Sequence, residues 1–284
     1  MSAEVSSFIE ALSLEQVGEG QYLGRNFVSH PGAPIFGGQI LAQALIAGGT
    51  IAPDKMVKTL HNVFARGGDA TKPLEIEVET MSAGRAMASA TVSMRQEGKL
   101  CARSIVFLTA EEPDLIRYSD PMPNVPGPEE CEDASREAEI MEVRVPKGYD
   151  LMSTGSNPPE LPIWMRFVDG GKGGHIDQAL FAYGTDGFLI GTALRPHADY
   201  DQSMAHSSIS TTVLTHTLTF HEPFDASAWH LVQHSSPYAG RGRTYGRADV
   251  FGTDGRIVAS FVQDNMVRDF PKGNAPGEGG RSKF

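Results

Sequence analysis

Cysteine is nearly absent from this sequence of 284 residues. Only Cys101 and Cys131 occur, and they do not form a CxxC pair. A disulfide framework or a structural zinc site needs more cysteines at closer spacing, so neither is expected. Isolated cysteines of this kind are typical of a reducing compartment, and a cytoplasmic location is predicted.

Long apolar runs are also missing. No stretch approaches the ~20 residues that a membrane-spanning helix needs. The first 16 residues contain no basic segment followed by a continuous apolar segment, so a signal peptide is not expected. No interaction with a membrane is predicted.

Positive charge is scarce. The sequence has 24 Lys and Arg against 35 Asp and Glu, a formal net charge of −11. This field opposes nucleic acid, and no lysine-rich tract overrides it. A polyanionic ligand would need a local cluster of cations, for which Arg241, Arg243 and Arg247 are the candidates that stand out in so acidic a chain.

Several common catalytic and cofactor motifs are absent. There is no GxSxG nucleophile elbow and no GxxxxGK[ST] phosphate loop. Residues 240–246 are glycine-rich, but their spacing does not fit a dinucleotide fingerprint and a strand is predicted to follow them. His216 and His221 are five residues apart on a strand-like run and should point to opposite faces, so they are interpreted as polar strand positions. No cofactor and no metal are predicted.

A faint internal repeat is present. At an offset of 156 residues, Val57 falls on Val213, Thr59 on Thr215 and Phe64 on Phe220. The same offset places residues 83–85, Ala-Gly-Arg, on residues 239–241. Matches that keep their order at a constant offset indicate a duplicated unit.

Each copy is predicted to be rich in strands. Leu74, Ile76 and Val78 alternate with glutamates, the pattern of a sheet with one solvated face. One nearly apolar helical segment precedes each copy, residues 39–47 and 176–183, and each ends at glycine. One buried helix followed by several antiparallel strands, twice, predicts an α+β fold.

The predicted division of the chain follows from composition. Residues 113–162 are rich in Pro, Glu and Asp and are interpreted as a connector over the surface. The resulting units are an N-terminal domain over 1–112, the connector over 113–162, a C-terminal domain over 163–270 and a loose tail over 271–284.

An ordered set of short motifs resembles the acyl-CoA thioesterase II family. These motifs are residues 36–39 and 64–69 in the first half, and residues 183–186, 193–197, 219–224 and 258–268 in the second. The resemblance implies a double hot-dog fold, in which two fused domains each wrap an antiparallel sheet around a buried helix. It also implies hydrolysis of fatty acyl-CoA to free acid and CoA.

The resemblance further implies a catalytic site in the second domain. The family uses an Asp, a Thr or Ser, and a Gln to activate a water, and the Asp and Gln fall on Asp186 and Gln263. The hydroxyl position falls on Val213, which has none. By strand alternation, Thr211 and Thr215 share a face with Val213 and are the candidate substitutes. The predicted substrate-binding residues are Gly37, Gly38, Arg241, Arg243 and Arg247, and a homo-oligomer, dimer or tetramer, is expected.

The residues themselves are suited to this chemistry, although each has a plainer interpretation. Partial burial beside the apolar run 188–190 would raise the pKa of Asp186 and improve it as a base. Gln263 offers a donor and an acceptor that could orient a water. Equally, Asp186 is a common turn residue in a Thr-Asp-Gly sequence, and Gln263 could be an exposed strand position.

Three alternatives stay open. A hot-dog hydratase or dehydratase acting on enoyl thioesters would need an Asp/His pair, for which His175 and Asp177 are the candidates. A non-hydrolytic acyl-CoA binding protein is the second alternative, because of Val213. The third concerns location: the final Ser282-Lys283-Phe284 is close to a Ser-Lys-Leu peroxisomal signal.

Overall fold

The structure is a computed structural model that describes residues 3–27, 34–135, 140–149, 156–168, 170–205 and 208–270. Side chains are described from Phe8 onward. The tail over 271–284, with its Ser-Lys-Phe end, lies outside the described residues, so the peroxisomal alternative stays a prediction.

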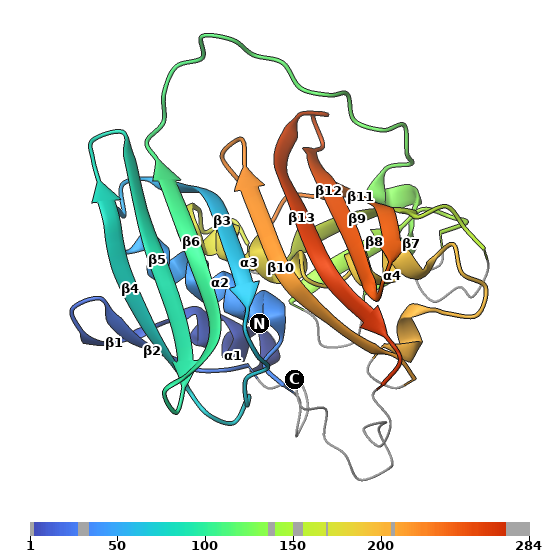
Figure 1. The fold of residues 1–284 in the computed structure, drawn as a ribbon. Helices are drawn as coiled ribbons and strands as arrows, with labels where there is room; N and C mark the ends of the chain where they lie inside the picture. Colours follow the sequence, from blue (N-terminus) through green and yellow to red (C-terminus); the bar gives the residue numbers. More distant parts are fainter. Residues whose placement is uncertain are drawn as a thin grey trace.

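The described strands form one antiparallel sheet (Figure 1). Their order is β1-β2-β4-β5-β6-β3-β10-β13-β12-β11-β9-β8-β7. In the first half the strands are β1 (Glu15–Gly18), β2 (Gln21–Gly24), β3 (Met56–Phe64), β4 (Leu74–Ala83), β5 (Met87–Gln96) and β6 (Lys99–Thr109). In the second half they are β7 (Glu132–Asp133), β8 (Met141–Val145), β9 (Glu160–Phe167), β10 (Ser210–Phe220), β11 (His230–Gly240), β12 (Arg243–Gly252) and β13 (Ile257–Arg268).

The duplication is visible in the strand order. The two halves meet where β3 pairs with β10, and on either side the order runs outward in the same way, β6-β5-β4 and β13-β12-β11. The offset of 156 residues carries the first residue of β4, Leu74, onto the first residue of β11, His230. It likewise carries Met87, the start of β5, onto Arg243, the start of β12. Two copies of one unit therefore build the molecule.

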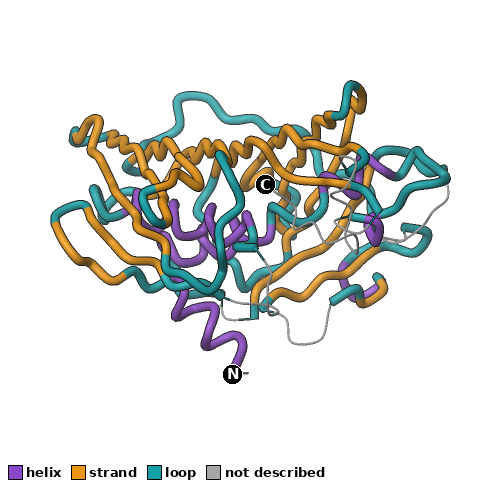
Figure 2. Tube along the Cα trace, turned by 60° about the horizontal axis from the view of Figure 1, so that its bottom comes forward, coloured by secondary structure: helices purple, strands orange, loops and turns teal. Residues whose placement is uncertain are grey.

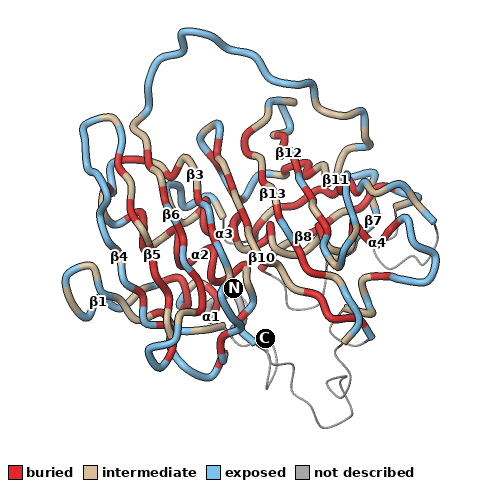
Figure 3. The backbone as a smooth tube through the Cα atoms, in the orientation of Figure 1, coloured by how far each residue is buried: buried red, intermediate tan, exposed pale blue. Residues whose placement is uncertain are grey.

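The predicted helices cover one face of the sheet. They are α2 (Gly37–Gly49) and α3 (Gly174–Gly184), and the short helix α4 (Leu189–Leu194) follows α3. Figure 2 shows the helices gathered on one side of the strands, and Figure 3 shows α2 and α3 among the buried parts of the chain. Almost every residue of α2 is buried, because a helix that is apolar all round is stable only inside a core. The N-terminal helix α1 (Ala3–Leu12), which the sequence did not predict, places Phe8 and Leu12 in the same core.

Helices α2 and α3 run antiparallel and very close together. A Cβ atom at Gly38 would collide with the backbone carbonyl of Tyr183, and one at Gly49 would collide with the ring of His175. The start of α2 thus lies against the end of α3, and the end of α2 lies against the start of α3. Glycine is required at both positions because only a bare backbone permits this approach.

The expected surface connector is only partly correct. Residues 110–127 do run over the surface, in an arc beyond one end of the central strands (Figure 1). The carbonyl of Pro126 accepts a hydrogen bond from the Trp164 indole at 2.8 Å. The second part of 113–162 was wrongly assigned, since it contains β7, β8 and the start of β9. The inward residues of β8, Val143 and Val145, are buried, but its short alternation is hidden in a Pro- and Glu-rich composition. The exact domain limits stay a prediction.

Among the described helices, none has the length and apolar character to cross a membrane.

Candidate functional site

The best candidate site lies where the two halves meet. Asp186 comes directly after α3, whose last turn is closed by Thr185. Its carboxylate accepts a hydrogen bond from the backbone N–H of Gly38, in the first turn of α2 from the other half of the chain. A Cβ atom at Gly37 would collide with the same carboxylate. The predicted residues Gly37, Gly38 and Asp186 are therefore brought together, and the first glycine of α2 leaves room for the acid.

The Asp186 carboxyl is electrostatically unusual. Desolvation raises its pKa from 3.8 to about 7, while the hydrogen bond from Gly38 acts in the opposite direction. The residue as a whole is half-buried, and its carboxyl group is the desolvated part. A carboxylate with a pKa near neutrality is a much stronger base than an exposed aspartate and is still partly ionised at pH 7.

Gln263 points at this carboxyl from the inner face of β13. Its side chain is buried, and Nε2 donates to the backbone carbonyl of Thr185 at 3.2 Å and to Asp186 Oδ1 at 3.4 Å. Nε2 also lies 2.8 Å from His216 Nδ1 on the neighbouring strand β10. The amide oxygen Oε1 is buried without a hydrogen-bond partner among the described protein atoms. Gln263 thus keeps an acceptor for a small ligand such as water.

A chain of hydrogen bonds assigns the orientation of that amide. The Thr185 hydroxyl donates to the carbonyl of Ala182 at 2.8 Å, so its oxygen can only accept from His216 Nε2, 3.1 Å away. His216 must then carry its proton on Nε2 and accept at Nδ1 from Gln263. Burial lowers the pKa of His216 to about 3, which keeps the ring neutral.

His216 was missed as a functional residue in the sequence, where it was interpreted as an ordinary polar strand position. The prediction that His216 and His221 face opposite sides is confirmed: His216 is fully buried, and His221 is exposed and bonds to Ser260 Oγ at 2.9 Å. Leu218 and Phe220, which follow His216 at alternate positions, are also buried, and that period was the available signal.

Neither candidate hydroxyl, of Thr211 or of Thr215, lies next to Asp186 and Gln263. A β-bulge between Val213 and Thr215 breaks the alternation, so Val213 pairs with buried Asn265 whereas Thr215 pairs with exposed Asp264. The Thr215 hydroxyl donates to Asp264 on the outer face at 3.2 Å, and its expected common face with Val213 was wrong. Thr211 is on the inner face, but it pairs with Val267, about 13 Å along β13 from Gln263.

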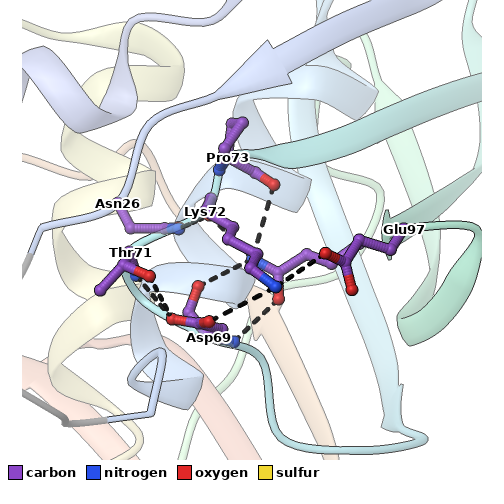
Figure 4. Close-up of polar contacts among 7 residues, drawn as sticks. Asn26, Asp69, Thr71, Lys72, Pro73 and Glu97 are labelled. Carbon is purple, nitrogen blue, oxygen red and sulfur yellow. Dashed lines mark hydrogen bonds and ion pairs between the residues drawn. The ribbon is translucent and has the colours of Figure 1, made fainter.

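The three arginines have different surroundings. Arg243 lines a cavity beside α4. Arg247 is exposed and its Nε donates to Ser235 Oγ at 3.3 Å, and Arg241 occupies the tight turn between β11 and β12 with a φ of 55°. In the first half, Lys72 is held by Glu97 at 2.7 Å and by Asp69 at 3.8 Å, a surface cluster shown in Figure 4.

The pair proposed for hydratase chemistry has a structural role. Asp177 is buried, and its carboxylate accepts backbone N–H groups of Gly171, Lys172 and Ala226 at 3.1 to 3.3 Å. His175 bonds to the carbonyl of Lys55 at 2.7 Å, at the end of α3 opposite to Asp186. Within the described residues, no cluster of three or more His, Cys, Asp or Glu side chains is placed to hold a metal ion.

Comparison with known proteins identifies the family. The model of the acyl-CoA thioesterase N-terminal domain matches residues 28–109, and the model of the C-terminal domain matches residues 118–267. The chain belongs to the acyl-CoA thioesterase II family. It is therefore a member of a family of thioester hydrolases, and its fold is the double hot-dog that the motifs predicted.

Relatives of known name support the same assignment over nearly the full chain. Acyl-CoA thioesterase 2 of Haemophilus influenzae is 28% identical over 94% of this chain and 99% of its own. Human acyl-coenzyme A thioesterase 8 is 29% identical over 92% of this chain and 88% of its own. A solved acyl-CoA thioesterase II from Mycobacterium marinum superposes with a TM-score of 0.78 at 27% identity, covering 95% of this chain and all of that one.

Proposed function

We propose that this thioesterase hydrolyses acyl-CoA by direct attack of a water molecule that Asp186 deprotonates and Gln263 orients. The observation that carries the proposal is the 3.4 Å contact between Gln263 Nε2 and a carboxyl whose pKa is raised to about 7. A base of that strength beside an oriented, unpaired amide oxygen is what water activation requires.

The proposed reaction has two steps. Asp186 takes a proton from the water, and the water oxygen attacks the thioester carbonyl carbon, which gives a tetrahedral oxyanion. The start of α2 lies beside Asp186, and the helix dipole there favours the negative charge of the oxyanion. Collapse of the oxyanion breaks the carbon–sulfur bond, and the proton on Asp186 returns to the departing CoA thiolate.

The same geometry argues against a covalent route through a hydroxyl nucleophile. The Thr185 hydroxyl, which is near Asp186 in sequence, already donates to the carbonyl of Ala182, and Val213 has no nucleophilic atom. An enoyl-CoA hydratase is disfavoured because the Asp177 carboxylate, which it would need for catalysis, is already bonded to backbone N–H groups. A non-hydrolytic acyl-CoA binding protein is the second candidate, favoured only by Val213.

One assay tests the proposal. Release of free thiol is measured with saturated acyl-CoA substrates of short, medium and long chain, with enoyl-CoA hydration measured in parallel. Thiol release with at least one chain length, without formation of 3-hydroxyacyl-CoA, is expected. Tight binding of acyl-CoA with no thiol release at any length would establish the binding protein instead.

Two accompanying features are also proposed. The enzyme is expected to act as a homo-oligomer, supported by the exposed apolar side chains Val63 and Ile105 on the outer face of the central strands. A cytoplasmic location is supported by Cys101, a buried free thiol.

A further inference from the structure

A cavity of about 450 Å³ opens where β12 begins and β13 ends. One wall is helix α4, which contributes Ala193 and Leu194, and the floor is the inner face of the sheet with Thr244 and Val267. Neither Asp186 nor Gln263 lines this cavity, so it is distinct from the catalytic residues described above.

Buried polar groups without a partner lie in the floor, at Thr244, and next to it, at Asn265. Thr244 is 4% exposed, and its hydroxyl has no hydrogen-bond partner among the described atoms. Asn265 is fully buried, and both its amide nitrogen and its amide oxygen are unpaired. Leaving one buried polar atom unsatisfied costs about 1–3 kcal/mol, so this many together indicate a polar ligand.

These groups connect the cavity with the catalytic residues. Thr244 and Asn265 are direct partners across β12 and β13, with Cα atoms about 5 Å apart. Asn265 is two residues from Gln263 on the same face, which places it about 7 Å along the strand. A row of buried, unpaired polar groups thus extends from Gln263 Oε1 through Asn265 to Thr244, which lines the cavity.

The mouth of the cavity has more positive than negative side chains, which is unusual in this acidic chain. Arg243 and Arg268 both line it, with Asp269 as the only carboxylate among the lining residues. Arg243 is exposed, and its Nη1 donates to the backbone carbonyl of Gly242 at 2.9 Å. Anionic groups are therefore favoured at the mouth, whereas neutral hydrogen-bonding groups are favoured deeper inside.

We propose that this cavity binds the CoA half of the substrate, with the pantetheine arm passing over Thr244 and Asn265 and the phosphates lying against Arg243. The arm carries amides and a hydroxyl, which match the unpaired amide of Asn265 and the hydroxyl of Thr244. A hydrocarbon chain would leave these groups unsatisfied, so the acyl group extends to the other side of Gln263. This assignment rests on the proposed thioesterase function and specifies how that site receives its substrate.

The test compares acyl-CoA with the matching acyl-pantetheine, which lacks the phosphates. Thr244→Val keeps the shape of the side chain but removes the hydroxyl, and kcat/KM is expected to fall about tenfold for both substrates. Arg243→Gln is expected to lower kcat/KM several-fold for acyl-CoA and to leave acyl-pantetheine unchanged. Calorimetric titration with free CoA should show the same losses of affinity, and it requires no hydrolysis.

Two substitutions serve as matched controls. Arg256→Gln removes one positive charge at the opposite end of the same β12–β13 hairpin, where Arg256 pairs with Asp254 at 2.7 Å. Thr91→Val removes a hydroxyl from β5, the equivalent strand of the first half, where it lies 3.5 Å from Glu79. Neither should change affinity for CoA or either kcat/KM.

The outcomes separate the two claims. Unchanged CoA affinity in both Thr244→Val and Arg243→Gln, with hydrolysis intact, would overturn this inference alone. An altered preference for acyl chain length in Thr244→Val, with CoA affinity unchanged, would assign the cavity to the acyl group and overturn it as well. A third outcome is that the wild-type protein binds CoA, the variants lose affinity for CoA as predicted, and the wild-type protein releases no thiol. In that case the cavity assignment holds and the hydrolytic function fails.

Discussion

Gln263 and His216 form a buried side-chain pair, with Gln263 Nε2 2.8 Å from His216 Nδ1. The histidine is in turn fixed by Thr185, 3.1 Å from its other ring nitrogen, at the last turn of α3. The orientation of the Gln263 amide is thereby coupled to the end of the helix that presents Asp186. A static network of this kind positions a water acceptor without needing a charged group.

His216 is therefore expected to act as a positioning residue. His216→Phe removes both ring nitrogens and should lower kcat by about 10- to 100-fold with little change in KM, because the amide of Gln263 loses its fixed orientation. His216→Asn can still present an acceptor near the Nδ1 position and should recover part of the loss. His221→Phe, on the outer face, is the control. Nitrogen NMR of labelled histidine should show His216 protonated on Nε2 only, and a proton on Nδ1 would contradict the network.

Gln263 itself should matter less than the base. Gln263→Ala removes the unpaired acceptor but leaves Asp186 in place, so kcat is expected to fall by about 10²-fold or less, and by less than in Asp186→Asn. Thiol-release kinetics at saturating acyl-CoA measure both variants. Unchanged kinetics in Gln263→Ala would make the residue a bystander.

The missing hydroxyl at Val213 gives a gain-of-function prediction. Val213 is on the inner face as the partner of Asn265, so Val213→Thr places a hydroxyl toward the site with little change in shape. One productive hydrogen bond in the transition state would raise kcat about tenfold. Thr211→Val should leave kcat nearly unchanged, because Thr211 lies two inner-face positions beyond the site. The opposite pattern, a loss in Thr211→Val and no gain in Val213→Thr, would show that Thr211 already supplies the hydroxyl.

The raised pKa of Asp186 has a consequence for stability. The folded-state pKa is about 7 against 3.8 for an exposed group, so ionisation is more costly in the folded protein. Below about pH 4 the group is protonated in both states and has no effect. Between pH 4 and 7 the wild type loses stability relative to Asp186→Asn, and the difference is constant above pH 7. At pH 8 the variant should be more stable by about 1–4 kcal/mol, measured by urea unfolding.

The matching control for stability is Asp254→Asn. That carboxylate is exposed in the turn before β13, and its hydrogen bonds with Arg256 lower its pKa. It should show no gain in stability as the pH rises. Equal urea midpoints for the wild type and Asp186→Asn at both pH 5 and pH 8 would mean that the Asp186 carboxyl is not desolvated.

Patterns with a fixed period were sufficient to predict much of this fold. The two apolar helices, the alternation of Leu74, Ile76 and Val78, and the offset of 156 residues all correspond to elements of the structure.

Features that depend on one extra residue or on long-range packing could not be predicted from the sequence. The bulge after Val213 moved Thr215 to the outer face, and a single inserted residue leaves no mark in a β-rich sequence. Asp186 and Gln263 were selected through family resemblance. Their contact, and the contact of Asp186 with Gly38, depends on how two halves of the chain pack, which no local pattern specifies.

Asp186 is proposed to be the base that activates water, and its carboxyl can be replaced without a change in size. Asp186→Asn keeps the size of the side chain and its ability to accept from Gly38, so the variant should fold and still bind CoA. The decisive measurement is kcat for thiol release from the best acyl-CoA substrate at pH 8. We expect a loss of about 10²- to 10⁴-fold in kcat with KM little changed. Turnover at the wild-type rate would contradict it.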